Sequence, residues 1–398
     1  MANKNGGFIG TDGLDAPDPP TGVTASGGAD GTASISFTAP TDTGTSAITG
    51  FVATASNGVG ATGTSSPISV TGLTLGTAAT FKAYAINAYG TSAASDPTSS
   101  ITPAESRGLF MGGEAGGSRI NVIQYISVAT TGNAQDFGDL TTVTTDSAAV
   151  SSSTRAVRGA GGGGDGVDST VMDYVTTATT GNATDFGDMY DSVQAHCGHG
   201  SNTRGIFSGG NVFPNDQNTI AYITIASTGN STDFGDLTVA RQHLAGCSST
   251  TRGVVGGGYS GSTRYDTIDY VTIASTGNAT DFGNLAAANR GPSGASSSTR
   301  GLFFGGDESG LTNEIQYITI ASTGNTTDFG DLSSNRYYTA ALSNSVRGVV
   351  GGGNDESVGR ANIIEYVTIA TTGNTTDFGD LLAANYVTTG TCNSHGGL

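Results

Sequence analysis

The sequence predicts an all-β protein with two parts, a small domain of alternating strands and a large domain of repeated short strands. Three observations predict this class. Glycine supplies 64 of the 398 residues, about twice its ordinary share, and glycine suits tight turns between strands. Short runs of alternating apolar and polar residues recur, as in Ser34–Phe37. One longer pattern repeats from residue 107 to the C-terminus.

Each copy of this pattern reads R-G, an apolar pair, G-G, a variable loop and then a run close to Y-[IV]-T-[IV]-A-[ST]-T-G-N-x-T-D-F-G-D-L. The alternating run predicts a half-buried strand, and the T-G-N element predicts a turn because Gly and Asn tolerate positive φ. A period of 47 to 49 residues points to repeated four-stranded units. The aspartate before Phe-Gly marks the copies at Asp136, Asp185, Asp233, Asp281, Asp328 and Asp377.

The paired glycines, the Tyr before the turn and the aromatic residue after it resemble the kelch repeat. The resemblance implies a six-bladed β-propeller at residues 105–398. The kelch Trp is replaced by Phe in every copy, and the kelch Arg is matched by Arg241 and Arg336, displaced to Arg290 and lacking elsewhere. The substituted phenylalanines are Phe137, Phe186, Phe234, Phe282, Phe329 and Phe378.

The spacing also predicts how the blades close. The next repeat arginine lies 19 residues after each repeat aspartate, as from Asp328 to Arg347. The same step from Asp377 reaches Gly396, so we interpret the C-terminus as a partial seventh copy. The first copy begins at Arg107 with no inner strand before it, so residues 386–393 are expected to supply that strand. The propeller would then have no open edge.

Residues 17–104 resemble a fibronectin type III domain, through Pro19, Pro20 and Val23 at the start and an A-x-N-x-x-G-x-S run ending at Ser92. The resemblance implies a β-sandwich. Phe37 stands where the family has Trp, and Ala79 where it has the corner Tyr. Residues 1–16 are Gly-rich with few large apolar side chains and cannot bury a core alone. We interpret them as an attachment peptide.

Charge and composition exclude several classes. The formal net charge of −18 would repel nucleic acid, and no apolar run reaches the ~18 residues of a membrane helix. The cysteines Cys197, Cys247 and Cys392 form no C-x-x-C pair and are interpreted as small buried hydrophobes. The run His196–His199 could in principle ligate a metal. We favour a structural role, because no carboxylate or second thiol is placed beside it.

Catalytic motifs are not found. The sequence has no P-loop, G-x-S-x-G elbow or H-E-x-x-H. Acid pairs such as Asp136 and Asp139 recur from copy to copy, so turn capping explains them better than catalysis, and Ca²⁺ binding remains an open alternative. We therefore expect no enzyme activity and no cofactor.

All length variation between copies falls in the loop between the second and third strands of each blade. In a propeller such loops share one face, so we hypothesise that this face contacts a partner. Unconstrained solvent loops that drifted after duplication are the equally weighted alternative. The candidate residues on this face are Asn211, Phe213, Asn215, Tyr259, Arg264, Asp307, Glu308, Asn354 and Asp355.

The Gly-, Ser-, Thr- and Asn-rich repeats resemble structural proteins of marine tailed phages such as cyanophages. That resemblance implies a virion protein, as a tail fibre, appendage or capsid decoration, located on the particle surface. It implies contacts with other virion proteins through residues 1–104, a homo-oligomeric state, and a propeller that faces host surface polysaccharide. No membrane insertion is expected. The alternatives are a cellular adhesin or carbohydrate-binding module without a virion role, and a propeller hydrolase or oxidase.

Overall fold

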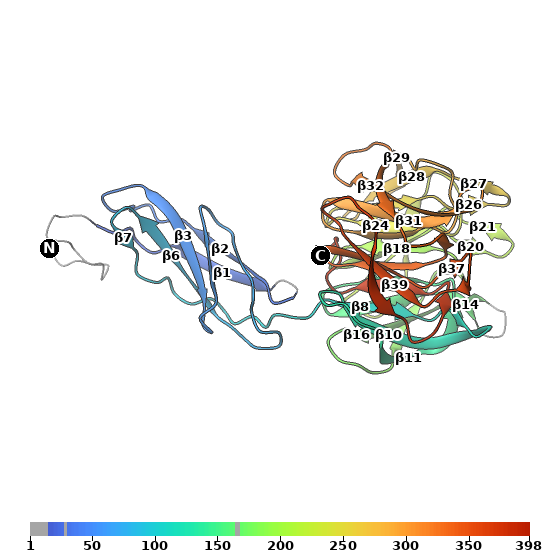
Figure 1. Cartoon of the computed structure of the whole chain (residues 1–398), viewed down its shortest axis with the longest axis horizontal. Helices are drawn as coiled ribbons and strands as arrows, with labels where there is room; N and C mark the ends of the chain where they lie inside the picture. Colours follow the sequence, from blue (N-terminus) through green and yellow to red (C-terminus); the bar gives the residue numbers. More distant parts are fainter. Residues whose placement is uncertain (1–14, 28–29, 164–167) are drawn as a thin grey trace. The chain divides into compact units, whose positions relative to one another are not determined.

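The computed structural model describes residues 15–27, 30–163 and 168–398. Strands make up 53% of the chain and helices 0%, which confirms the all-β class. No helix within the described ranges is long and apolar enough to cross a membrane. The chain divides into two compact units, Met1–Glu105 and Ser106–Leu398. Each unit is described by itself (Figure 1).

Two predicted features fall largely outside the described residues. Of the proposed attachment peptide at residues 1–16, only Asp15 and Ala16 are described. Of the variable loop at residues 165–168, only Asp168 is described.

The first unit contains two antiparallel sheets that share one core. Phe37 of one sheet and Phe51 of the other meet in this core with ring centroids 4.8 Å apart. The strands, in pairing order, are β1 (Thr21–Gly27), β2 (Ala33–Thr38) and β5 (Ile68–Val70) in one sheet, and β4 (Gly60–Gly63), β3 (Ile48–Ala55), β6 (Phe81–Asn87) and β7 (Gly90–Thr91) in the other.

An irregular segment pairs with β6 through hydroxyl groups spaced three residues apart. The backbone N–H groups of Ser92, Ser95 and Thr98 donate to carbonyl oxygens of β6 at 2.8–3.0 Å. Their side-chain oxygens accept hydrogen bonds from β6 N–H groups at 2.9–3.0 Å. The exposed edge of β6 is thereby satisfied without a regular strand.

The second unit contains six antiparallel sheets of four principal strands (Figure 1). Within each sheet the strands pair in order from an inner strand, which touches neighbouring sheets, to an outer one. The sheets are β42 (Thr389–Cys392), β8 (Arg107–Met111), β10 (Ser118–Ser127), β11 (Gln135–Thr145); β12 (Ala148–Ser151), β13 (Arg155–Gly159), β16 (Val171–Thr176), β17 (Thr184–Asp188); β18 (Cys197–Gly200), β19 (Arg204–Ser208), β22 (Thr219–Thr224), β23 (Thr232–Asp236); β24 (Ala245–Ser248), β25 (Arg252–Gly256), β28 (Thr267–Thr272), β29 (Thr280–Asn284); β30 (Ser293–Ser296), β31 (Arg300–Asp307), β32 (Leu311–Thr319), β33 (Thr327–Asp331); and β35 (Ala340–Ser343), β36 (Arg347–Gly351), β39 (Ile363–Thr368), β40 (Thr376–Asp380).

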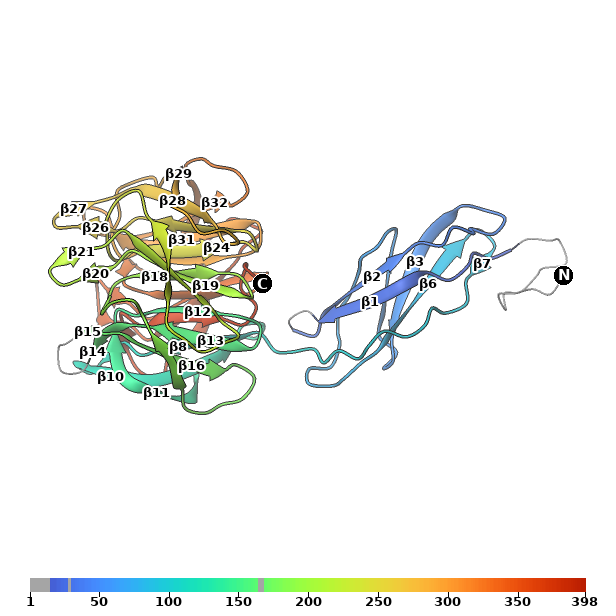
Figure 2. The same ribbon diagram turned by 180° about the vertical axis from the view of Figure 1, so that it is seen from behind.

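Short strands extend the variable loops beyond these sheets. Figures 1 and 2 place β14, β20, β21, β26 and β27 at one end of the second unit, and the C-terminus at the opposite end. The end with the short strands is called the loop face from here on. The short strands are β9 (Glu114–Ala115), which pairs with β41 (Asn385–Tyr386); β14 (Gly161–Gly163) with β15 (Asp168–Ser169); β20 (Asn211–Val212) with β21 (Asn215–Asp216); β26 (Tyr259–Ser260) with β27 (Thr263–Arg264); and β37 (Asn354–Asp355) with β34 (Arg336–Tyr337) and β38 (Gly359–Arg360).

The C-terminal strand completes the first sheet, as the spacing predicts. Residues Thr389–Cys392 pair with β8, and β42 also contacts the inner strands β35 and β12. The turn into β8 copies the intact repeats despite the chain break. The N–H of Arg107 donates to Asn393 Oδ1 at 2.8 Å, as that of Arg347 donates to Asn344 Oδ1 at 2.7 Å. The six inner strands thus form a closed ring.

A cation–aromatic stack repeats in every sheet. In β25, the guanidinium of Arg252 lies 4.3 Å from the ring centroid of Tyr270, which meets Phe282 edge to face. Nη1 of the same arginine donates to the carbonyl of Ile320 in the next sheet at 2.8 Å. The equivalent arginines are Arg107, Arg155, Arg204, Arg300 and Arg347. Each stack therefore packs within its own sheet, while its arginine donates a hydrogen bond to the neighbouring sheet.

The T-G-N turns form a second contact between sheets. The N–H of Gly277 donates to the carbonyl of Phe234 at 2.7 Å, and Asn278 Oδ1 accepts from the N–H of Asp236 at 3.1 Å. The same asparagine contact recurs between all six pairs of neighbours. Side-chain capping here is made by these asparagines, rather than by the repeat carboxylates to which the sequence interpretation assigned it.

Buried charges lie in pairs. Arg241 pairs with Asp269 at 2.9 Å, and both side chains are fully buried. Arg336 pairs with Glu365 in the same way, and a third pair, Arg158 with Asp173, uses an arginine on β13 that the kelch comparison did not identify. Arg290, interpreted as a displaced kelch Arg, instead lies at the loop face with Asp307.

Candidate functional site

The residue ten positions after each repeat aspartate has positive φ, whatever its type. These six residues precede the inner strands and together are called the collar. Only one of them is glycine, and a β-branched residue in this region is an outlier. The collar comprises Asp146 (φ 53°), Ala195 (56°), His243 (53°), Gly291 (66°), Tyr338 (55°) and Val387 (51°).

The collar is joined by a closed circle of backbone hydrogen bonds. Each collar N–H donates to the carbonyl oxygen of the collar residue in the preceding sheet. Positive φ turns both groups toward the neighbouring sheets, and the six bonds offset the local cost of about 1–2 kcal/mol per non-glycine residue. The bonds are Ala195 to Asp146 (2.7 Å), His243 to Ala195 (2.7 Å), Gly291 to His243 (3.0 Å), Tyr338 to Gly291 (3.0 Å), Val387 to Tyr338 (3.2 Å) and Asp146 to Val387 (3.2 Å).

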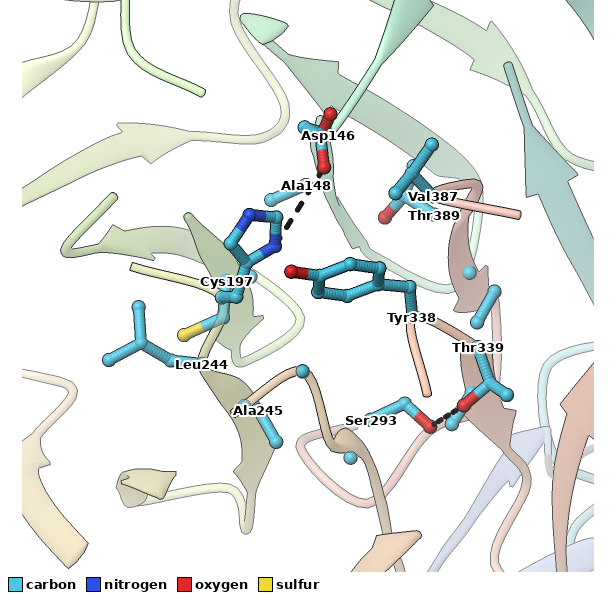
Figure 3. Close-up of a pocket in the computed structure, with 18 of the residues that line it drawn as sticks. Asp146, Ala148, Cys197, Leu244, Ala245, Ser293, Tyr338, Thr339, Val387 and Thr389 are labelled. Carbon is cyan, nitrogen blue, oxygen red and sulfur yellow. Dashed lines mark hydrogen bonds and ion pairs between the residues drawn. The ribbon is translucent and has the colours of Figure 1, made fainter. Parts of the chain in front are cut away.

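The collar surrounds a pocket of about 110 Å³ that all six sheets line. At its floor the inner strands carry only Gly or Ala, for example Gly198, Gly246 and Ala341. A Cβ on Gly246 would lie 2.5 Å from the carbonyl oxygen of Gly198, so adjacent inner strands are nearly in backbone contact there. Figure 3 shows Tyr338 projecting into this pocket, with Asp146 on the side toward its hydroxyl group.

The ring of inner strands surrounds a central channel, and the C-terminal tail covers the end of this channel that is opposite the loop face. His395 Nε2 lies 2.9 Å from the carbonyl oxygen of Ser151. The N–H of Gly396 donates to the carbonyl oxygen of Ser296 at 3.0 Å. Gly397 packs against the backbone of Gly200. These partners come from three sheets, so the tail crosses the ring instead of adding the second strand of a seventh copy. Arg107 and β8 already occupy that place.

Aromatic side chains gather on one side of the collar. This set, called the array from here on, comprises Tyr259, His243, Tyr338 and Tyr337. The ring of His243 stacks on Tyr259 (centroids 5.6 Å apart, planes 8°) and contacts Tyr338 at 4.4 Å. Tyr338 contacts Tyr337 at 4.2 Å. Gly291 makes room for this array, because a Cβ there would lie 2.6 Å from the ring of Tyr338.

Cations border the array. The guanidinium of Arg290 lies 5.6 Å from the centroid of Tyr259 and 6.0 Å from that of Tyr337. Asp307 accepts hydrogen bonds from Arg290 at 2.7 Å and from Arg264 at 2.9 Å. Although burial alone would raise the pKa of Asp307, these bonds hold it below its usual value.

Burial also sets the protonation of the collar. It lowers the pKa of His243 to about 3, helped by nearby Arg290, so the imidazole is neutral at pH 7. The 3.8 Å approach of its Nδ1 to Asp146 Oδ1 is then a contact between a neutral ring and a carboxylate. Burial raises the pKa of Tyr338, which keeps its hydroxyl protonated.

The nine residues expected at the loop face divide into two groups. Tyr259, Arg264 and Asp307 belong to the cluster around Arg290. Asn354 Nδ2 donates to the hydroxyl oxygen of Tyr337 at 3.3 Å. Asn211 Nδ2 donates at 2.9 Å to Asp216 Oδ1, which also accepts at 2.7 Å from Gln242, the residue before His243. Five of the nine therefore lie at or beside the array.

The other four lie apart from it. Phe213 is 82% exposed in the loop that joins β20 and β21, and Asn215 is exposed at the start of β21. Burial raises the pKa of Glu308, which is half-buried after β31. Asp355 accepts from the N–H groups of Ser357 and Val358 and stabilises its own turn.

Sequence reasoning missed Asp146, His243, Tyr337 and Tyr338 as site residues. Length variation directed the search to the loops between second and third strands, whereas the collar segment never changes length. The available signal was chemical. At a constant distance from the repeat aspartate, the collar position changes from Asp to Ala, His, Gly, Tyr and Val.

Within the described ranges, no group of three or more His, Cys, Asp or Glu side chains could hold a metal ion. His199 Nε2 lies 2.9 Å from Ser208 Oγ, and the three cysteines are buried free thiols. No protein-family model matches this sequence, and no curated protein matches it either.

Proposed function

We propose that the second unit is a six-bladed kelch-like β-propeller and that the first is a fibronectin type III-like sandwich. The closed circuit of inner strands and the arginine–tyrosine–phenylalanine stack in each sheet support the propeller. Two sheets with one shared core support the sandwich.

We propose further that the protein is a non-enzymatic structural protein of a phage virion, as a tail fibre, appendage or capsid decoration. Its propeller faces outward and binds a host surface glycan at the loop face. The carrying observation is the asymmetric array of Tyr259, His243, Tyr338 and Tyr337 on a rigid collar. Aromatic faces beside polar groups suit the apolar and hydroxyl surfaces of sugars.

Binding is favoured over catalysis by the chemistry of the collar. An imidazole with a pKa of about 3 is a weak base at neutral pH, whereas an efficient general base has a pKa near the operating pH. The carboxylate of Asp307 is engaged by two guanidinium groups. These groups are arranged to hold one another in place.

The virion assignment makes residues 1–104 the attachment region, through which the chain contacts other virion proteins, and it implies a homo-oligomer in the particle. Mass spectrometry of gradient-purified particles tests this. The proposal expects peptides from both units at structural-protein abundance. Their absence from particles, together with their presence on a cell surface, would favour a cellular adhesin instead.

Glycan binding is tested with the full chain on an array of bacterial surface polysaccharides and oligosaccharides. The proposal expects saturable binding to a restricted set of glycans. An array without any bound glycan would remove glycan recognition while leaving the virion role to the particle experiment.

A further inference from the structure

We propose that the collar pocket takes the terminal residue of an uncharged glycan, with the collar side chains Asp146, His243 and Tyr338 as its specificity determinants. This inference rests on the proposed glycan-binding function. It adds where on the loop face recognition occurs, and which part and charge class of the glycan is read.

The tail covers the end of the channel opposite the loop face, where His395 contacts Ser151 and Gly396 contacts Ser296. Between the collar pocket and the tail lies a smaller cavity of about 50 Å³, lined by Gly198, Gly246 and His395 among others. A chain that enters from the loop face therefore meets the tail, so we infer that a glycan enters by its end.

The pocket is small compared with a sugar. A cavity of ~150 Å³ admits a single benzene molecule. The collar pocket is about 110 Å³ and open to solvent, so it encloses part of one sugar ring at a time. The rest of that ring and the next residue of a bound chain would lie outside, over the loop face.

The collar offers complementary groups for a sugar. His243 and Tyr338 supply ring surface for apolar C–H groups. The Asp146 carboxylate accepts hydrogen bonds, as sugar hydroxyls require, and the protonated Tyr338 hydroxyl can both donate and accept. The residues of the array are held by mutual stacking and by the backbone circle, so little side-chain entropy is lost on binding.

Charge selects against acidic sugars. Asp146 and His243 both line the pocket, and the neutral imidazole of His243 adds no positive charge there. Arg290 and Arg264 are already engaged by Asp307. The net charge of −18 adds long-range repulsion of anions. A neutral hexose or N-acetylhexosamine fits this environment.

The test applies the full chain to an array whose glycans share internal sequences and differ in the terminal residue. Methyl glycosides of glucose, galactose, mannose and N-acetylglucosamine serve as soluble competitors. Binding should follow the terminal residue, and one methyl glycoside should compete. Asp146→Asn and Tyr338→Ala should each weaken binding at least tenfold. Asparagine tolerates positive φ, so the first variant keeps the backbone circle.

Val346→Ala is the matched control, because Val346 is 55% exposed in the turn between β35 and β36; its binding should stay within twofold. If array binding survives both collar variants, or follows internal residues whatever the terminus, the inference is wrong and glycan binding occurs elsewhere on the protein. If acidic termini bind best, the charge argument is wrong. If no glycan binds, glycan recognition and the inference fall together, and the virion role is left to the particle experiment.

Discussion

The backbone N–H of Asp146 donates a hydrogen bond of 3.2 Å to the carbonyl oxygen of Val387. This bond joins the segment before β12, the first inner strand along the chain, to the segment before β42, the last, across 241 residues of sequence (387 − 146 = 241). It completes the collar at the place where the C-terminal strand completes the ring. Ring closure and the binding pocket therefore depend on the same residues.

Removing β42 should open the ring. A chain ending at Val387 loses the four residue pairings with β8 and exposes the edge of that strand, which invites aggregation. We expect loss of the cooperative thermal transition of the second unit and formation of soluble aggregates. Calorimetry and size-exclusion chromatography check this. A monomeric truncated chain with unchanged Tm would contradict the closure.

The tail should make a smaller contribution. A chain ending at Ser394 keeps β42 but loses the bonds of His395 and Gly396 to two inner strands. Two hydrogen bonds are worth about 1–3 kcal/mol together. Urea denaturation should show a loss of that size with an unchanged m-value, whereas no loss would mean that the tail contributes nothing.

In a double-mutant cycle on a buried charge pair, the losses in free energy of unfolding should not be additive. Asp269→Asn leaves the guanidinium of Arg241 buried without its counterion and should cost about 3–5 kcal/mol. Replacing both partners with Met and Leu should recover most of that loss. Denaturant unfolding of the single and double variants gives the coupling energy. Additive effects would contradict a direct pair.

Two glycines with similar φ allow the cost of backbone strain to be measured separately from the cost of a steric clash between sheets. Gly235 (φ 147°) packs against Gly277 of the next repeat, and a Cβ on it would lie 2.5 Å from that carbonyl. Gly277 (φ 153°) has open space around its missing Cβ. Alanine at Gly277 should cost about 1–3 kcal/mol through strain alone. Alanine at Gly235 should cost clearly more, and equal losses would show that the sheets are not in contact there.

Buried histidines predict the pH dependence of stability. Burial lowers the pKa of His196 to about 3 and that of His199 to about 4, below the ordinary 6.5. Below pH 6.5, these two histidines therefore bind protons in the unfolded chain but stay neutral in the folded chain. Stability is full above pH 6.5 and falls toward pH 4, by up to about 1.4 kcal/mol per pH unit for each histidine.

His199→Gln should flatten this slope by one histidine's share, because glutamine does not titrate. Urea denaturation between pH 7.5 and 4.5 measures it. The lowered pKa values of Asp307 and Asp355 act near and below pH 4. The raised pKa values of Glu308 and Glu314 act at the acid end of this window with the opposite sign, and they are common to both proteins, so the difference between the two slopes reports His199. A variant with the wild-type slope would mean that His199 titrates normally in the folded protein.

The periodic parts of the structure could be read from the sequence. The constant step from repeat aspartate to repeat arginine predicts that the C-terminus supplies an inner strand, and β42 pairs with β8 accordingly. Alternation within the repeats predicts the strands themselves. These features depend on local pattern and counting, which a sequence displays directly.

The collar could not be read in the same way. Nothing in the local preferences of Tyr338 or Val387 indicates positive φ, since both disfavour it. Hydrogen bonds from neighbouring sheets impose that conformation, so it exists only in the closed ring. The buried pair of Arg158 with Asp173 was likewise not predicted, because only the pairing of β13 with β16 brings the two side chains together.

Amide hydrogen exchange at the C-terminus tests ring closure most directly. Peptides covering Thr389–Cys392 should be protected as strongly as those covering Ala340–Ser343, because both segments form inner strands. Exchange of the C-terminal peptide at the rate of an unstructured chain, while Ala340–Ser343 stays protected, would contradict the closed ring and the collar built on it.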